Sequence, residues 1–204
     1  NSLRQVHKRV LKIGLHVREA LLRVGDVAPV LFLEICRAVD GPVSAEVLST
    51  HVDGMLSEGR EIATWASNVV VKLPSTTEGL EAISTLSREG IAINQTLCFS
   101  VTQALLGARA GATFVSPFVG RLDDASHVGM DVVRDIVQVF QLHKIRAKVL
   151  AASIRHPLHC VEAAKAGASI ATIPFKVLMQ MMQHPLTDVG ITRFAQDWQK
   201  AVRL

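Results

Sequence analysis

Short apolar segments alternate strictly with helical patterns from residue 42 onward in this 204-residue chain. We predict six strands, because each segment is short, apolar and bounded by turn residues. They are residues 42–47, 69–74, 91–96, 113–117, 148–152 and 169–173. Strands that alternate with helices form a parallel sheet, either open or closed into a barrel. No glycine-rich phosphate loop follows the first strand, so a dinucleotide-binding fold has little support and we favour a (β/α)8 barrel.

The helices between these strands carry recognisable start signals. Ser75 and Glu78 form a capping-box pattern, and Ser100 and Gln103 form a second one. In such a pattern the serine side chain satisfies a free N–H of the first helical turn. We therefore expect Ser75 and Ser100 to be the N-cap residues of two helices.

The last predicted helix covers residues 188–202. Ile191, Phe194 and Trp198 are spaced by three and four residues along it, so they share one face of the helix. We expect this face to point inward.

Residues 1–28 differ from the rest of the chain. Apolar residues recur at spacings of three and four from Leu3 to Val24, which predicts one amphipathic helix. We therefore divide the chain into residues 1–28, an atypical basic helix in place of the first barrel strands, and residues 29–204, the α/β barrel domain. Because six βα units are visible instead of eight, we expect a barrel that is incomplete or atypical at its N-terminal side.

Charge, hydropathy and cysteine content limit the class of protein. The formal net charge is +4, but residues 1–25 hold six basic residues and one acidic residue, so the remainder is near neutral and a nucleic-acid partner is not supported. No apolar run has membrane-spanning length, so we expect a soluble protein without a membrane partner. Three scattered cysteines argue against a disulfide framework and fit a reducing compartment, so we expect a cytoplasmic protein.

Two histidines, His156 and His159, form an H-x-x-H pair. The pair lacks the glutamate and the i,i+4 spacing of a zinc-binding helix. We therefore expect no metal site.

The segment Val69–Pro74 places one lysine, Lys72, in an otherwise apolar strand. Three β-branched residues in a row suit a parallel strand that is covered on both faces. A desolvated lysine tends to lose its proton, and its neutral amine attacks carbonyl groups to form Schiff bases. The alternative is a lysine at a strand end whose ammonium reaches solvent.

Polar residues follow or end several of the predicted strands. They are Glu46, Lys72, Asn94, Thr96, Ser116, Arg121, Ser153 and Arg155. In a (β/α)8 barrel the active site lies at these strand ends. Each residue alone has a structural explanation as a helix cap or a solvated side chain. Together they supply an amine, a carboxylate, hydroxyl groups and two guanidinium groups that suit a phosphate monoester, which indicates a Schiff-base enzyme for a phosphorylated sugar or keto compound.

Several segments, in the correct order, resemble transaldolases. They are residues 41–47 (GPVSAEV), 70–74 (VVKLP), 77–80 (TEGL), 94–100 (NQTLCFS), 103–106 (QALL), 115–124 (VSPFVGRLDD), 151–155 (AASIR) and 184–188 (HPLTD). The chain is most similar to the short subfamily that includes the fructose-6-phosphate aldolases. The resemblance runs from about residue 29 to residue 198.

The resemblance implies a (β/α)8 barrel that moves a dihydroxyacetone unit between sugar phosphates in the pentose phosphate pathway. The family reaction converts sedoheptulose 7-phosphate and glyceraldehyde 3-phosphate to erythrose 4-phosphate and fructose 6-phosphate. It implies that Lys72 forms the Schiff base, and that Glu46 and Thr96 hold a water that carries protons. No metal or other cofactor is implied.

The same resemblance implies substrate-binding roles and a partner. Asn94 and Ser116 match residues that line the donor site. The phosphate-binding positions match Arg121, Ser153 and Arg155. Homo-oligomers are implied as well, with the last helix as a contact.

Two features bear on the activity that the resemblance implies. The aldolases of the subfamily have glutamine and tyrosine where this chain has Glu46 and Phe99, so transfer is favoured over aldol cleavage. The family's N-terminal aspartate and its T-T-N-P motif are absent from residues 1–28. A shifted reading frame, a truncated fragment or replaced strands would each explain this. Two alternatives to transaldolase activity therefore stay open. One is an aldolase that cleaves fructose 6-phosphate, and the other is a catalytically impaired module that binds sugar phosphates.

Overall fold

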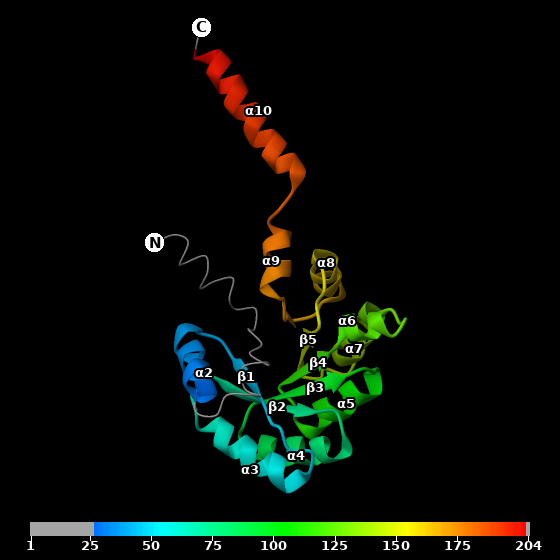
Figure 1. Cartoon of the computed structure of the whole chain (residues 1–204). Coiled ribbons are helices and arrows are strands. Elements are labelled where there is room, and N and C mark those ends of the chain that lie inside the picture. The colour runs from blue at the N-terminus through cyan, green and yellow to red at the C-terminus, as the bar shows by residue number, and fades with distance from the viewer. Residues whose placement is uncertain (1–26, 203–204) are drawn as a thin grey trace.

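The computed structural model describes residues 27–202 and shows an α/β fold built on one six-stranded parallel sheet (Figure 1). The strands lie side by side in chain order. They are β1 (Val43–Glu46), β2 (Val69–Pro74), β3 (Ile93–Cys98), β4 (Phe114–Pro117), β5 (Lys148–Ala151) and β6 (Ile170–Ala171). The helices are α2 (Val27–Ala38), α3 (Val52–Ala63), α4 (Thr77–Arg88), α5 (Val101–Ala110), α6 (Val119–Asp124), α7 (Gly129–Leu142), α8 (Pro157–Ala166), α9 (Phe175–Met181) and α10 (Pro185–Ala201).

The six predicted βα units are confirmed. Every strand pairs in parallel with the next one along the chain, and α3, α4, α5, α7 and α8 pack against one another in turn on one face of a curled sheet. Within residues 27–202, no strand pairs with the outer edge of β1 or of β6. The described residues thus form six consecutive units of a barrel-like α/β fold. The predicted helix over residues 1–28 falls almost wholly outside the described residues and stays a prediction.

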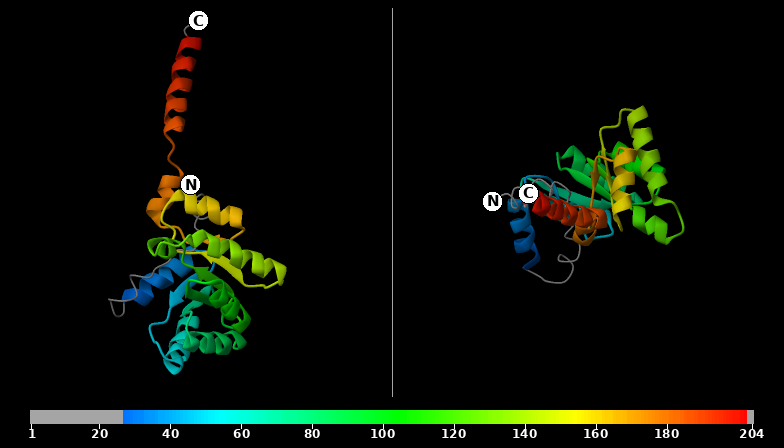
Figure 2. Two further views of the ribbon diagram at one scale, coloured as in Figure 1. Left: turned by 90° about the vertical axis from the view of Figure 1, so that its right-hand side faces the viewer. Right: turned by 90° about the horizontal axis from the view of Figure 1, so that it is seen from above.

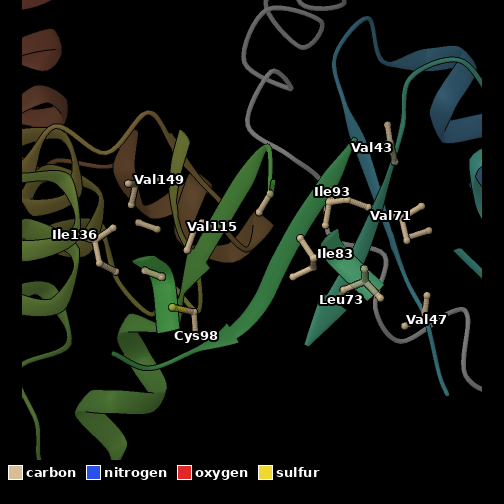
Figure 3. Packing of buried hydrophobic residues seen from close by; sticks show 14 of the residues in the cluster. Val43, Val47, Val71, Leu73, Ile83, Ile93, Cys98, Val115, Ile136 and Val149 are labelled. Atoms are coloured by element: carbon tan, nitrogen blue, oxygen red, sulfur yellow. The ribbon is translucent and has the colours of Figure 1, made fainter. Parts of the chain in front are cut away.

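The hydrophobic core lies between the sheet and the helices that cover it. Alternate strand residues, among them Val43, Val71, Ile93, Val115 and Val149, are buried against helix residues (Figure 3). Because side chains alternate across a strand, the residues between them point to the other face, the inner face of the curved sheet. The core thereby fixes which strand residues are available for a site.

One N-cap prediction is wrong and the other is confirmed. Ser100 caps α5, since its hydroxyl oxygen accepts from the N–H of Gln103. The cap of α4 is Thr76 instead of Ser75, because the Thr76 hydroxyl oxygen accepts from the N–H of Gly79. The Ser75 hydroxyl instead donates to the carbonyl oxygen of Thr96, 2.7 Å away, and so joins the end of β2 to β3.

Strand β3 begins two residues later than predicted and ends at Cys98 instead of Thr96. Gly90 adopts a φ of 84°, and the N–H of Ile91 donates to the carbonyl oxygen of Leu86. This backbone conformation and this hydrogen bond end α4. They involve residues 90 and 91, so the strand begins later than the apolar pattern alone predicts.

Helix α10 contradicts the prediction of an inward face. It extends away from the sheet, as Figures 1 and 2 show, and its described side chains include none that is buried. Ile191, Phe194 and Trp198 are 63, 75 and 71% exposed. The periodicity correctly grouped these residues on one face, but it carries no information about what covers that face. Neither α10 nor any other helix within residues 27–202 combines the length and apolarity needed to cross a membrane.

Candidate active site

A row of polar residues crosses the inner face of the sheet. Glu46 of β1 lies in register with Lys72 of β2, and Lys72 lies in register with Asn94 of β3. Parallel pairing in register places these three side chains next to one another on one face, although 26 residues separate the first pair in the chain. The flanking residues at odd positions, such as Val71 and Ile93, belong to the core on the other face.

Lys72 is buried and paired with a carboxylate. Its side chain is 2% exposed, and its Nζ lies 2.9 Å from Oε2 of Glu46, whose side chain is 23% exposed. The Phe118 ring lies 5.8 Å from Nζ, within the range of a cation–π contact. An unpaired buried ammonium is costly, so Glu46 stabilises the charged form. Because the carboxylate is also within proton-transfer distance, transfer to Glu46 would leave a neutral, nucleophilic amine.

Asn94 is held by hydrogen bonds on both sides of its amide. The Ser116 hydroxyl donates to Oδ1 of Asn94 over 2.6 Å, and Nδ2 of Asn94 donates to the Ser44 hydroxyl oxygen over 3.1 Å. Asn94 and Ser116 are fully buried. Since both amide atoms are engaged, the orientation of the amide beside Lys72 is fixed.

Thr96 lies on the same face as Asn94, two residues further along β3. Its side chain is buried, and Oγ1 has no hydrogen-bond partner among the described residues. A buried hydroxyl is costly to leave unsatisfied, so this group suits a hydrogen bond to a bound molecule. Thr96 therefore lies on the same face as Lys72 and Asn94, and among the described contacts no hydrogen bond joins its side chain to Glu46.

The three predicted phosphate-binding residues come from helix α6 and from the adjoining loop between β5 and α8. Arg121 lies on α6, and Ser153 and Arg155 lie between β5 and α8. The N–H of Gly120 donates to the carbonyl oxygen of Ser153 over 3.0 Å, which fastens the start of α6 to this loop. The Arg121 guanidinium lies 5.2 Å from the centre of the Phe118 ring.

Close packing of α6 against the loop after β5 requires glycine at position 120. A Cβ atom at Gly120 would lie 2.6 Å from Cγ of Arg155 and closer still to the carbonyl oxygen of Ser153. Ser153 itself has a φ of 59°, in the left-handed region that non-glycine residues seldom occupy. Unusual backbone of this kind concentrates at functional sites.

The Arg155 guanidinium forms an exposed ion pair with a carboxylate. One of its terminal nitrogens donates to Oδ2 of Asp124 over 2.7 Å, and both side chains are more than half exposed. An exposed ion pair of this kind is weak, so the guanidinium can exchange Asp124 for another anion.

Two residues of the site were missed at the level of sequence. Ser44 receives a hydrogen bond from Asn94, and Phe118 faces both Lys72 and Arg121. Ser44 lies two residues before Glu46, so alternation along the strand was a sufficient signal for it. Phe118 follows β4, and only the tertiary structure shows which cations its ring faces.

The remaining nucleophile candidates are cysteines. Cys36, Cys98 and Cys160 are free thiols. Burial raises the pKa of Cys98 to about 12, so this cysteine is protonated at neutral pH and is a poor nucleophile. Within residues 27–202, no group of three or more histidine, cysteine, aspartate or glutamate side chains has an arrangement that could hold a metal ion.

Comparisons with known proteins agree with this geometry. A family model described as transaldolase/fructose-6-phosphate aldolase matches residues 2–204, including most of the N-terminal segment in which the expected motifs are absent. A protein of Roseiflexus castenholzii named "Probable transaldolase" is 64% identical over 165 residues, which cover 81% of this chain and 76% of that protein. A protein of Dehalococcoides mccartyi with the same name is 63% identical over 166 residues, which cover 81% and 77% of the two chains.

A solved structure shares the fold at low sequence identity. It is inosine 5' monophosphate dehydrogenase from Legionella pneumophila, with a TM-score of 0.53 and 14% identity. The match covers 80% of this chain and 50% of the dehydrogenase chain. This likeness concerns the fold alone.

Proposed function

The chain belongs to the transaldolase/fructose-6-phosphate aldolase family, and we propose that it carries its substrate as a Schiff base on Lys72. It is an enzyme of the transaldolase type, which transfers an aldehyde or ketone residue between sugar phosphates. In the proposed reaction the transferred residue is the dihydroxyacetone unit of sedoheptulose 7-phosphate or fructose 6-phosphate.

The first half of the reaction forms the imine and breaks a carbon–carbon bond. The neutral amine of Lys72 adds to the C2 carbonyl carbon of the ketose phosphate. The proton that Lys72 gave to Glu46 then passes to the departing hydroxyl, so that water leaves, an iminium forms and Glu46 is a carboxylate again. When the bond between C3 and C4 breaks, its electron pair moves into an enamine that stays on Lys72. The proton of the C4 hydroxyl passes to a base as the aldose phosphate leaves. We assign this proton to Glu46, through a water that Thr96 would also bind; the proximity of Glu46 to Lys72 supports the assignment.

The second half reverses these steps with a different aldehyde. The enamine attacks the acceptor's carbonyl carbon, and the proton returns to the new alkoxide. Water then adds to the iminium, which releases the new ketose phosphate and restores the amine. Asn94, which lies beside Lys72, and Ser116, which donates to Asn94, have fixed orientations, so they suit the hydroxyl groups of the bound unit.

The observation that carries this proposal is the buried pair of Lys72 and Glu46 at the strand ends. A lysine side chain with 2% exposure points to a functional role, because burial of the ammonium costs free energy. The test is transfer from fructose 6-phosphate to erythrose 4-phosphate, with sedoheptulose 7-phosphate as the measured product. We expect Lys72→Met to abolish transfer and to leave the fold intact, because methionine fills a similar volume.

Lys148→Met is the matched control for this test. Lys148 also lies on a strand, but its side chain is exposed. The control variant should keep wild-type activity. Transfer by Lys72→Met at the wild-type rate would refute the assignment of Lys72.

Cleavage without transfer is the second candidate activity. It is favoured where glutamine and tyrosine replace Glu46 and Phe99, and this chain has neither. The Phe99 ring packs edge-on against Phe118, 5.7 Å between centroids, so it contributes an apolar wall instead of a phenol hydroxyl. Release of glyceraldehyde 3-phosphate without an acceptor, at a rate equal to transfer, would favour the aldolase. No turnover of either kind would favour a sugar-phosphate-binding module.

We also propose that the apolar face of α10 docks on a second copy of the chain. Ile191, Phe194 and Trp198 share one face of this projecting helix and are largely exposed. Contiguous apolar surface of this kind marks interfaces, and a homo-oligomer is what the family resemblance leads us to expect. The three free cysteines fit a reducing compartment, so we propose a cytoplasmic location.

A further inference from the structure

His159 connects α6 and the loop between β5 and α8, the two segments that carry the proposed phosphate-binding residues. It lies in the first turn of α8, and its side chain is 12% exposed. Its Nε2 lies 3.1 Å from Oδ2 of Asp123, at the end of α6. On the other side of the ring, the backbone N–H of Arg155 donates to Nδ1 over 3.3 Å. One imidazole thus joins α6 to the loop between β5 and α8.

The two contacts together define where the imidazole proton lies. Nδ1 accepts a hydrogen bond, so it carries no proton, and the remaining proton of the neutral ring is on Nε2, which donates to Asp123. Asp123 is itself oriented, because its Oδ1 accepts from the N–H of Gly129 over 2.9 Å. Burial, and then the nearby His156, lower the pKa of His159, which favours this neutral form although Asp123 opposes the shift.

We propose that His159 is a positioning residue for the phosphate group of the substrate. Its Nδ1 sets the backbone of Arg155, while Asp123 holds the ring from the side of α6, so that Arg121 and Arg155 face the same phosphate. The inference rests on the proposed function, since it assigns a role beside the phosphate and none in the chemistry at Lys72. Ser153 has a strained φ in the same loop, so this backbone needs an external restraint.

Two substitutions separate the contacts of the ring. The side-chain oxygen of asparagine can take the place of Nδ1, so His159→Asn keeps an acceptor for the N–H of Arg155. The side-chain nitrogen of glutamine can take the place of Nε2, so His159→Gln keeps the donor to Asp123 and loses that acceptor. We expect His159→Gln to raise KM for fructose 6-phosphate about three- to tenfold, as one neutral hydrogen bond accounts for. His159→Asn should raise KM less, and kcat should stay within about twofold in both variants.

Dihydroxyacetone, a donor without phosphate, is the internal reference. Its KM should be equal in wild type, His159→Asn and His159→Gln, because the proposed role acts only through the phosphate-binding loop. If His159 had only a structural role, its substitution would raise KM for both donors by the same factor. Equal changes for fructose 6-phosphate and dihydroxyacetone, or no change in either, would overturn the proposal.

His156→Gln is the matched control. His156 lies 3.8 Å from His159, centroid to centroid, and is exposed at the start of the same helix. It has no hydrogen bond to the backbone of Arg155 among the described contacts. At a pH where His159 is neutral, the substitution of His156 should leave KM for fructose 6-phosphate unchanged. If His159→Gln fails to fold, Asp123→Ala tests the same chain of contacts, since it releases the ring, and it should raise KM in the same direction.

The pH dependence supplies a second readout. Protonation of Nδ1 turns the acceptor into a donor that faces the N–H of Arg155, so KM for fructose 6-phosphate should rise as pH falls through the lowered pKa of His159. The titratable groups that act on the ring are Asp123 from α6, with Arg155 and His156 from the loop before α8. The phosphate of the substrate titrates in the same range, so the profile of His159→Asn, which lacks the imidazole, is the baseline. Identical profiles would contradict the proposal.

Failure of this inference and failure of the proposed function are distinguishable. Formation of an imine between Lys72 and dihydroxyacetone in wild-type protein tests only the chemistry at Lys72. If that imine forms and His159→Gln leaves KM for fructose 6-phosphate unchanged, the role of His159 is refuted alone. If it does not form, the proposed function is refuted and the role of His159 is refuted with it.

Discussion

At the scale of single residues, alternation along the strands explains why much of the candidate site could be predicted. Lys72, Asn94 and Ser116 were predicted from strand ends, and the structure places them on the inner face with Glu46. The contact between Lys72 and Glu46 could not be predicted, because register between strands depends on packing across the sheet. The role of His159 could not be predicted either, since it depends on Asp123, 36 residues earlier in the chain.

Removal of the carboxylate beside Lys72 is the first prediction at this scale. In Glu46→Ala the proposed proton acceptor is lost, and we expect kcat for transfer to fall about 10²–10⁴-fold, as is typical of general acid–base groups. Steady-state kinetics check this, with Glu61→Ala on the exposed side of α3 as the control. Unchanged kcat in a folded Glu46→Ala protein would contradict the role of Glu46.

Arg155 provides a second prediction. Its guanidinium would trade the exposed pair with Asp124 for the substrate phosphate, because a phosphate dianion is the stronger partner. Arg155→Ala should therefore raise KM for fructose 6-phosphate tenfold or more and change KM for dihydroxyacetone by less than about twofold. Equal losses for both donors would refute the phosphate assignment.

At the scale of elements, the βα units could be predicted more reliably than their ends. Short apolar segments bounded by turn residues identified every described strand, because these strands pack against helices. The cap of α4 and the start of β3 were misplaced, because Ser75 and Ile91 have tertiary or turn hydrogen bonds that compete with the local pattern.

The contact between α6 and the loop after β5 gives a prediction for one glycine. In Gly120→Ala the new methyl group would overlap the carbonyl oxygen of Ser153, so we expect a loss of about 1–3 kcal/mol in the free energy of unfolding and a raised KM for phosphorylated donors. Denaturant unfolding measures the first effect. Gly190→Ala is the matched control, because nothing lies within 4 Å of a Cβ there, and alanine in the interior of α10 should stabilise by about 0.5–1 kcal/mol. A Gly120→Ala protein as stable as wild type would contradict the close packing.

At the scale of the whole molecule, the sheet has two open edges among residues 27–202 and one projecting apolar helix. Six βα units of the expected barrel are present in this range, and they follow one another along the chain as the sequence pattern predicted. The sequence could not predict that α10 extends away from the sheet. An amphipathic pattern is the same whether the apolar face packs against its own chain or against another one.

The proposed contact through α10 predicts a change of mass in solution. Trp198→Glu places a charge on the exposed apolar face, and we expect it to dissociate the oligomer at micromolar concentration. Gln196→Glu adds the same charge on the opposite side of the helix and should leave the mass unchanged. Sedimentation equilibrium distinguishes the two, and a monomeric wild-type protein would refute the proposed interface.

The most direct test of the central claim is borohydride reduction in the presence of fructose 6-phosphate, followed by peptide mass spectrometry. Reduction fixes the imine as a stable secondary amine, so the mass identifies both the modified residue and the three-carbon unit that it carries. We predict a dihydroxyacetone-derived adduct on Lys72 in the wild-type protein and none in Lys72→Met. A folded wild-type protein without an adduct, or with the adduct on another lysine, would contradict the claim that Lys72 is the nucleophile of this site.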